Sequence, residues 1–168
     1  MQILKADNTH LQDMNALIAS CRRTLLSTGV HQWDEYYPDS GTIRDGISHG
    51  ELFIAILADE IVGGVTLNQT EDPEYAQIRW RYAAPALVVH RLCVSPSHQG
   101  QGIGSALMAF AEGYSRTAQL SSIRLDVYSD NAIAVNLYKR LGYTTAGQFT
   151  SPSRKHPFYC MEKRIRQI

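Results

Sequence analysis

This 168-residue sequence has no net charge, no long apolar run and no closely spaced pair of cysteines. Its 16 Lys and Arg residues balance 16 Asp and Glu residues, so no net field favours nucleic acid or an anionic membrane as a partner. No run approaches the ~20 apolar residues that a membrane span requires. The first ten residues carry Lys5 and Asp7 with no apolar stretch behind them, unlike a secretory signal or a transit peptide.

Cysteines and histidines show no metal or disulfide pattern. Cys21, Cys93 and Cys160 are widely spaced and form no C-x-x-C pair, which argues against a disulfide framework and a zinc site. The six histidines are scattered without ligand spacing. We therefore expect no metal, and a reducing cytoplasmic location.

Length and patterning predict a single α/β domain over residues 1–168, with no repeat or linker inside it. Apolar periodicity predicts the element order β-α-α-β-β-β-α-β-α-β-β, which indicates a sheet with helices on its faces. The predicted strands are 1–6, 52–57, 61–67, 87–94, 123–128, 143–150 and 158–165. The predicted helices start at Asn8 or Thr9 and end near residues 27–29, run through Ile43 and Ile47, and span 102–114 and 131–141. The third helix has Ile103, Leu107, Phe110 and Tyr114 on one face, and Gly142 is expected to end the fourth. In the strand 123–128, apolar residues alternate with Arg124, Asp126 and Tyr128.

Two segments lack a regular pattern. Residues 31–40 are aromatic and acidic and contain Pro38, which suits a loop. Residues 68–85 are polar and contain two prolines, so we expect a variable connection with some strand.

A glycine-containing loop at residues 95–104 joins a buried strand to the start of a helix. The first N–H groups of a helix lack intrahelical partners, so such a junction can hold a phosphate, although the same glycines could only allow tight helix packing. A dinucleotide-binding fingerprint fails because Ser105 stands where its third glycine belongs, and a P-loop fails because this loop has no lysine.

Gln99, Gly102 and Gly104 form a Gln-x-x-Gly-x-Gly pattern directly after a strand, and residues 129–143 form a second segment one helix and one strand later. The first pattern resembles the coenzyme A loop, Gln/Arg-x-x-Gly-x-Gly/Ala, of the Gcn5-related N-acetyltransferase (GNAT) family, and the second segment is similar to another segment of that family. The resemblance is clear over about 87–143, and it implies a mixed, largely antiparallel sheet of about seven strands with about four helices.

The resemblance also implies acetyl-coenzyme A as the cosubstrate, without a metal. Backbone groups of Leu92, Cys93 and Val94 would pair with the pantetheine arm as an added strand does. The pyrophosphate would lie on the loop formed by Gln99, Gly100, Gln101, Gly102, Ile103, Gly104 and Ser105.

Asn131 and Tyr138 are seven residues apart, so they project from the same side of their helix. The resemblance implies that Asn131 contacts coenzyme A and that Tyr138 protonates the departing thiolate. From the residues alone, a helix cap at Asn131 and a core aromatic at Tyr138 are the favoured interpretations, and the resemblance reverses that preference.

An alkyl ammonium has a pKa near ~10, so a base should remove a proton before attack on a thioester. Asp126 precedes Asn131 by five residues on the non-apolar face of its strand, where some similar acetyltransferases carry a glutamate base. His90 is the second candidate, because its ordinary pKa is near ~6.5. Cys93 has no histidine–acid pair nearby in sequence, so we expect direct transfer rather than an acetyl-cysteine.

The expected acceptor is a primary amine of a small molecule or of a protein amino terminus. Trp33, Glu35 and Tyr36 lie in an aromatic and acidic loop that suits a cationic amine, or that simply packs on the core. A non-catalytic module that senses acetyl-coenzyme A is the alternative function, and a longer acyl donor stays open. The family includes monomers and homodimers, and the sequence does not choose between them.

Overall fold

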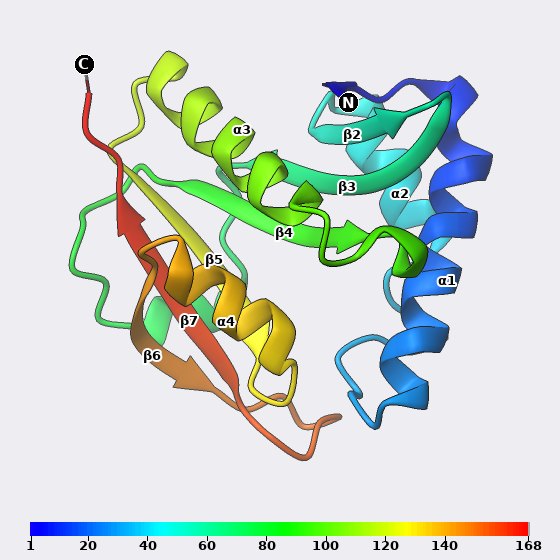
Figure 1. Ribbon diagram of the computed structural model, residues 1–168. Coiled ribbons are helices and arrows are strands. Elements are labelled where there is room, and N and C mark those ends of the chain that lie inside the picture. The colour runs from blue at the N-terminus through cyan, green and yellow to red at the C-terminus, as the bar shows by residue number, and fades with distance from the viewer. Residues whose placement is uncertain (168) are drawn as a thin grey trace. The chain divides into compact units, whose positions relative to one another are not determined.

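The computed structural model describes residues 1–167 and contains seven strands and four α-helices in that range (Figure 1). They follow in the predicted order: β1 (Gln2–Lys5), α1 (Leu11–Ser27), α2 (Ser40–Ser48), β2 (Leu52–Leu57), β3 (Glu60–Asn68), β4 (Leu87–Val94), α3 (Ile103–Thr117), β5 (Ser122–Tyr128), α4 (Ala132–Arg140), β6 (Thr144–Phe149) and β7 (Phe158–Arg164). Short 3-10 turns are η1 (Asn8–His10), η2 (Pro73–Gln77) and η3 (Pro96–His98).

The strands form a mixed sheet in the order β1-β2-β3-β4-β5-β7-β6. The pairs β1–β2, β2–β3, β5–β7 and β6–β7 are antiparallel, while β4–β5 is parallel. The predicted fold class, a largely antiparallel sheet of about seven strands with about four helices, is confirmed.

Two compact units make up the chain, and each has its own packing. Unit 1 comprises residues 1–67 and 91–110, and unit 2 comprises residues 68–90 and 111 onward. Strand β4 and helix α3 contribute residues to both units, because the unit boundaries fall inside them.

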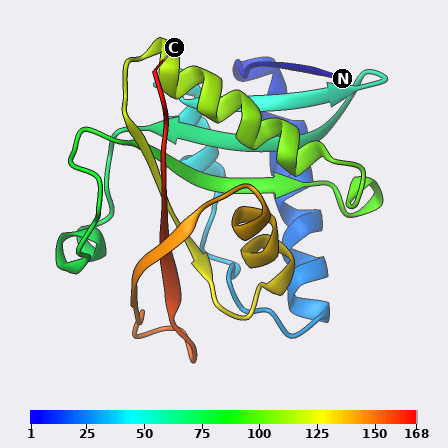
Figure 2. The same ribbon diagram turned by 60° about the vertical axis from the view of Figure 1, so that its left-hand side comes forward.

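The β2 strand of unit 1 has two buried faces. Leu52 and Ile54 belong to a core formed with α1 and α2, whereas the ring of Phe53 lies 5.0 Å from that of Phe110 in α3. Figure 2 shows α1 behind β2 and β3, and the start of α3 in front of these two strands. Since successive side chains of a strand point to opposite faces, the continuous apolar run 52–57 serves both layers.

Neighbouring glycines in β3 let the helices approach this strand closely from both sides. A Cβ at Gly63 would lie 3.0 Å from the backbone oxygen of Cys93 and from Cδ1 of Leu107. A Cβ at Gly64 would lie 2.8 Å from Cε of Met14, which is the flexible end of a side chain. Unit 1 therefore has less freedom to accept a methyl group at Gly63 than at Gly64.

We expect Gly63→Ala to lower the free energy of unfolding by about 1–3 kcal/mol, because backbone and a packed helix must move apart to admit the methyl group. Gly64→Ala should cost less, since Met14 can change rotamer. Urea unfolding of the two variants beside the wild type measures both values. Equal stability of Gly63→Ala and the wild type would contradict the close approach.

Unit 2 covers both faces of β5, which differs from the one-sided pattern that the sequence predicted. Ile123, Leu125 and Val127 are buried as expected, but Arg124 and Tyr128 are buried too. The Arg124 guanidinium pairs with Glu71 and donates to the carbonyl of Tyr82, so the 68–85 connection covers this second face. The alternating polar positions of β5 therefore lie inside the protein.

Three local predictions were wrong in detail. The side chain that caps the first helical turn is that of Asp7, rather than Asn8 or Thr9, because Asp7 accepts the N–H of Thr9 at the start of η1. The 68–85 connection contributes only Asn68, the last residue of β3, to a strand, and then forms the turn η2. Tyr114 is exposed, since the buried stripe of α3 runs through Leu107, Met108 and Ala111 instead of through 110 and 114.

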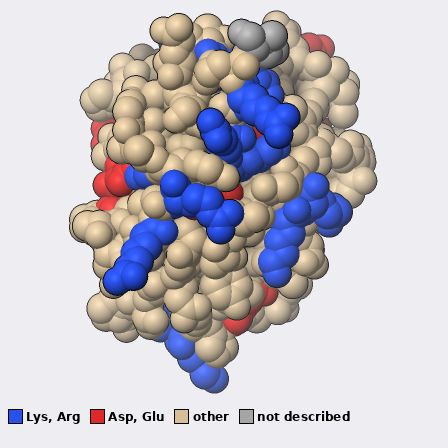
Figure 3. Space-filling view, turned by 90° about the vertical axis from the view of Figure 1, so that its left-hand side faces the viewer, with Lys and Arg blue, Asp and Glu red and all other residues tan. Residues whose placement is uncertain are grey.

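The balanced composition hides a local charge difference. The face in Figure 3 exposes more Lys and Arg than Asp and Glu side chains.

Within residues 1–167, no helix combines the length and the apolar character needed to cross a bilayer.

Candidate active site

The glycine loop of unit 1 connects the end of β4 to the first turn of α3. Gly100 and Gly102 have φ values of +78° and +82°, in the left-handed region that side-chain-bearing residues rarely adopt. A Cβ at either position would meet no heavy atom within 4 Å. These glycines are therefore required by the backbone conformation and leave open space above it, whereas packing against the helix does not require them.

Open backbone at a helix start fits a phosphate. Residues 99–102 are exposed, and the first hydrogen bond of α3 joins the N–H of Ala106 to the carbonyl of Gly102. The preceding N–H groups point out of the helix end, and the dipole of this 15-residue helix adds partial positive charge there. The residues of this loop thus fit the pyrophosphate of a coenzyme A-type molecule.

The end of β4 offers backbone groups beside this loop. Leu92 and Val94 are half-buried and Cys93 is buried. The Cys21 thiol donates to the carbonyl of Val94 at 3.3 Å, so this carbonyl already has one partner. The Cys21 thiol and burial raise the pKa of Cys93, which disfavours the thiolate that an acetyl-cysteine route would need.

Asp126 of unit 2 is a half-buried carboxyl on β5. Its Oδ2 accepts a hydrogen bond of 2.7 Å from the hydroxyl of Tyr75, a residue of η2 that is 1% exposed. Burial raises the pKa of Asp126 to about 6, the Tyr75 hydrogen bond works against this rise, and the charges of Asp72 and Glu74 add to it. A carboxyl with a pKa near 6 is mostly ionised at pH 7 and is still a usable base.

Both functional candidates on α4 also have structural roles. Asn131 caps the helix, since its Oδ1 accepts the N–H of Ala134 at 3.2 Å. Tyr138 is buried, and its ring centroid lies 6.0 Å from that of Tyr143. Burial and the Asp126 charge raise the pKa of Tyr138 well above its usual value, so its hydroxyl stays protonated. A protonated phenol is the form that a proton donor needs.

His90 is tied to the chain that follows β3. Its Nε2 lies 2.9 Å from Oδ1 of Asn68 and 3.1 Å from the carbonyl of Thr70. Two oxygen acceptors at one nitrogen indicate that Nε2 carries the proton. These hydrogen bonds give His90 a role in positioning the chain after β3. Only its Nδ1 could then accept a proton.

The sequence model of the acetyltransferase (GNAT) family matches residues 13–143. The chain belongs to this family. The streptothricin acetyltransferase of Escherichia coli is 30% identical over 113 residues, which are 67% of this chain and 56% of that protein. The uncharacterized N-acetyltransferase YesJ of Bacillus subtilis is 26% identical over 158 residues, which are 92% of this chain and 84% of that protein. The chain therefore aligns with only about half of the streptothricin enzyme's length.

Solved GNAT structures share the fold. A GNAT-family acetyltransferase from Streptococcus agalactiae has a TM-score of 0.83 at 21% identity, covering 99% of this chain and 96% of that one. The PaiA N-acetyltransferase of Thermoplasma acidophilum, in complex with coenzyme A, has a TM-score of 0.73 at 17% identity and covers 97% and 98%. The prediction of an acetyl-coenzyme A-dependent N-acetyltransferase is confirmed at the level of the family.

The loop between α1 and α2 of this GNAT chain contains the residues predicted to bind the acceptor. Trp33 is 5% exposed and packs in the core with α1 and α2, whereas Tyr36 is 78% exposed and Glu35 is also exposed. The N–H groups of Tyr36 and Tyr37 donate to Oδ1 of Asp34, which fixes the turn of this loop. Only Glu35 and Tyr36 of the three predicted residues lie at the surface.

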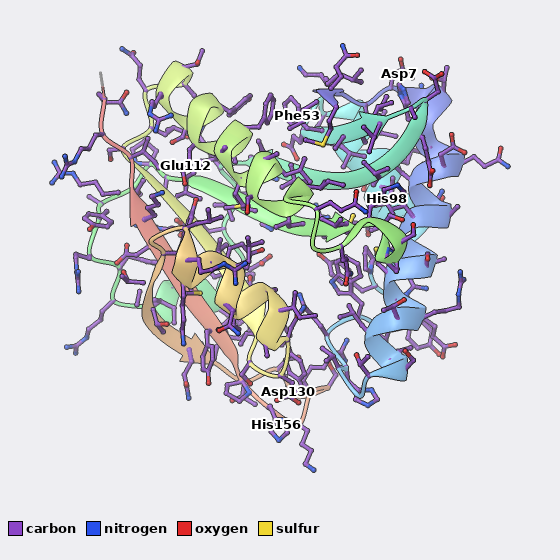
Figure 4. All side chains as sticks on the ribbon, in the orientation of Figure 1. Asp7, Phe53, His98, Glu112, Asp130 and His156 are labelled. Atoms are coloured by element: carbon purple, nitrogen blue, oxygen red, sulfur yellow. The ribbon has the colours of Figure 1, made fainter. Side chains whose placement is uncertain are left out.

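Sequence reasoning missed Tyr75, the partner of Asp126. The two residues are 51 positions apart, and Tyr75 lies in a connection without periodicity. It also missed an exposed acid–imidazole pair, in which Nδ1 of His156 lies 2.7 Å from Oδ2 of Asp130 (Figure 4). No spacing rule in the sequence joins either pair.

Metal ligation has no support in the described part of this GNAT chain. Among residues 1–167, no group of three or more His, Cys, Asp or Glu side chains is arranged to hold a metal ion.

Proposed function

We propose that this chain transfers the acetyl group of acetyl-coenzyme A to a primary amine by direct attack in a ternary complex. The acceptor is a small molecule or a protein amino terminus. The conformation of the glycine loop carries the proposal, because two left-handed glycines hold a helix start open with no side chain above it. Family membership supplies the acetyl donor, a thioester whose carbonyl carbon accepts the amine.

Three groups of residues bind the cosubstrate in this proposal. N–H groups of 99–105 donate to the pyrophosphate, and the backbone of 92–94 pairs with the amide-containing arm. Asn131 contacts the same molecule through its side chain while it continues to cap α4. Coenzyme A-bound GNAT structures with this fold support the assignment of the cosubstrate.

Proton transfers involve Asp126 and Tyr138. The Asp126 carboxylate accepts a proton from the acceptor ammonium, and the neutral nitrogen forms a bond to the acyl carbon as the carbon–sulfur bond breaks. The Tyr138 hydroxyl donates its proton to the departing sulfur, and the second proton that the nitrogen loses as the amide forms restores the Tyr138 phenol. His90 is the second candidate base, and its hydrogen bonds to Asn68 and Thr70 favour a positioning role.

We expect Tyr138→Phe to lower kcat about 100-fold, because general acid catalysis contributes about 10²–10⁴ in rate. Coenzyme A should still raise the melting temperature of the variant, since the backbone loop is untouched. Free-thiol release from acetyl-coenzyme A with a panel of amines measures the rate, and a thermal-shift assay measures binding.

Tyr143→Phe is the matched control for this experiment. Tyr143 is also buried, and burial and the nearby Glu112 carboxylate raise the pKa of its hydroxyl above the usual value. Its loss should leave the rate unchanged. Full activity of Tyr138→Phe would remove it from the mechanism, and coenzyme A binding without turnover by the wild type on any amine would favour a sensor.

We propose a single functional domain over residues 1–168, because the family match at 13–143 draws on both compact units.

The three cysteines are free and buried, which supports the proposal of a reducing cytoplasmic location.

A further inference from the structure

Arg91 has a strained backbone inside a strand. Four non-glycine residues among those described have left-handed φ values, and three of them lie in turns between elements: Ala58, Asp59 and Gln119. Arg91, with φ of +52°, is the one that lies within a strand, β4. Such conformations cost of order 1–3 kcal/mol and persist where the surrounding structure demands them.

The guanidinium of Arg91 reaches the loop between α1 and α2. Its Nη1 donates to the hydroxyl of Tyr37 at 2.7 Å, and the group lies 5.9 Å from the centre of the Tyr37 ring. Its Nε is buried and has no hydrogen-bond partner, and no carboxylate within the described residues forms an ion pair with it. Because the buried Nε is out of a ligand's reach, a ligand anion would meet the terminal nitrogens, Nη1 and Nη2, of this half-buried guanidinium, which has no acid beside it among residues 1–167.

Arg22 of α1 repeats this arrangement at the next residue of the loop. Its Nη2 donates to the carbonyl of Pro38 at 2.6 Å, and its Nε is likewise buried without a partner. Two guanidinium groups are thus held on consecutive loop residues, Tyr37 and Pro38, by one hydrogen bond each. The loop itself carries the carboxylates of Asp34, Glu35 and Asp39, and neither arginine forms an ion pair with them.

The direction of the cosubstrate relates Arg91 to the chemistry, in a step that rests on the proposed function. The pyrophosphate lies on the loop that follows β4, and the arm runs back along Val94 to Leu92. The thioester is at the far end of the arm, so it lies toward the residue before Leu92, which is Arg91. An amine attacking there comes from the side of Arg91 and Tyr37.

We propose that Arg91, positioned by Tyr37, binds a carboxylate of the acceptor, with Arg22 as a second cationic group on the same loop. The acceptor is then an amine that carries a carboxylate near its amino group, as an amino acid does. The planar guanidinium matches a carboxylate through two parallel hydrogen bonds, which would fix the amine against the acyl carbon.

Paired substrates test this proposal. The rate of thiol release is measured with free amino acids and with the matching amino acid amides, in which a neutral carboxamide replaces the carboxylate. Arg91→Gln should lower kcat/KM for the preferred amino acid about 10- to 100-fold, and for its amide by roughly threefold or less. Arg91→Lys should give an intermediate loss, because lysine keeps the positive charge but lacks the two parallel N–H donors of the guanidinium.

Further variants separate binding from folding. Tyr37→Phe should raise KM for the amino acid with little change in kcat, since it releases Arg91 without removing it. Arg23→Gln, an exposed arginine beside Arg22 on α1, should change neither value. Melting temperatures of all variants identify any loss that comes from unfolding.

Two outcomes would overturn the proposal. Equal losses with acids and amides in Arg91→Gln, while the wild type acetylates amines, would make Arg91 structural and leave the proposed function intact. Absence of transfer to every amine tested would overturn both.

Discussion

Asp126→Asn should slow acetyl transfer about 100-fold and, at pH 7.5, raise the free energy of unfolding. The loss of rate follows from removal of a general base, which contributes about 10²–10⁴. Asparagine keeps the shape of the side chain and its carbonyl can still accept the Tyr75 hydroxyl, which now donates to Oδ2 at 2.7 Å. A loss of function together with a gain of stability distinguishes a functional carboxyl from a structural one.

The gain of stability follows from the pKa of Asp126. Its native value is about 6, above the unfolded value of about 3.9, so the native state binds the proton more tightly between these pH values. Its contribution to stability is therefore fully present below pH ~4 and is lost as the pH rises through ~6. The ionised carboxyl then costs about 1–3 kcal/mol, which asparagine does not. Urea unfolding should show equal stabilities near pH 4 and a more stable variant at pH 7.5.

The pH dependence of kcat/KM provides the second measurement. With Asp126 as base, the wild-type value should rise through pH ~6 and then level off, because the carboxylate accepts the proton of the ammonium. Asp126→Asn should continue to rise toward the pKa of the amine, since only neutral amine then reacts. A plateau that persists in the variant would exclude Asp126 and favour His90.

Tyr75→Phe is a graded control for Asp126. The hydrogen bond from Tyr75 lowers the pKa of Asp126, so its removal should move the bend of the profile to higher pH. A bend at unchanged pH would show that the titrating group is not Asp126.

Gly102→Glu should abolish coenzyme A binding, with a loss of at least about 100-fold in affinity. The carboxylate would enter the open space over the loop and repel a phosphate there, and a side chain at φ of +82° adds strain of about 1–2 kcal/mol. Thermal shift with coenzyme A and direct titration measure the effect. Retention of binding would mean that the pyrophosphate lies elsewhere.

Gly113→Glu is the matched control, because a Cβ at Gly113 in α3 also meets nothing within 4 Å and its φ is not in the left-handed region. It adds the same charge to the same helix and should keep coenzyme A binding. Gly102→Ala separates strain from charge, since alanine carries only the strain. We expect its affinity to fall between the wild type and Gly102→Glu.

Local patterns made the glycine loop and the end of α4 predictable. Gly142 was expected to end the helix after Leu141, and its φ of +87° and the hydrogen bond from its N–H to the carbonyl of Lys139 match that expectation. Each of these features depends on residues a few positions apart, so the sequence contains the whole interaction.

The raised pKa of Asp126 could not be predicted from the sequence, because it depends on long-range contacts. The sequence placed Asp126 on the non-apolar face of its strand but gave no indication that this face is covered. The connection 68–85 covers this face, and its Tyr75 and Trp80 pack there with rings 5.1 Å apart. A segment without periodicity gives no sign of what it will cover.

The sequence by itself determined the order of strands and helices, the glycine loop at the start of α3 and the family motifs, because periodicity, turn chemistry and glycine conformation are local. The tertiary structure alone decided that β7 lies between β5 and β6, that Tyr75 meets Asp126 and that Arg91 meets Tyr37. The residues that bury Asp126 and raise its pKa lie about 50 positions away in the chain, as does Tyr37, which contacts Arg91. Contacts over such distances in sequence follow no local pattern.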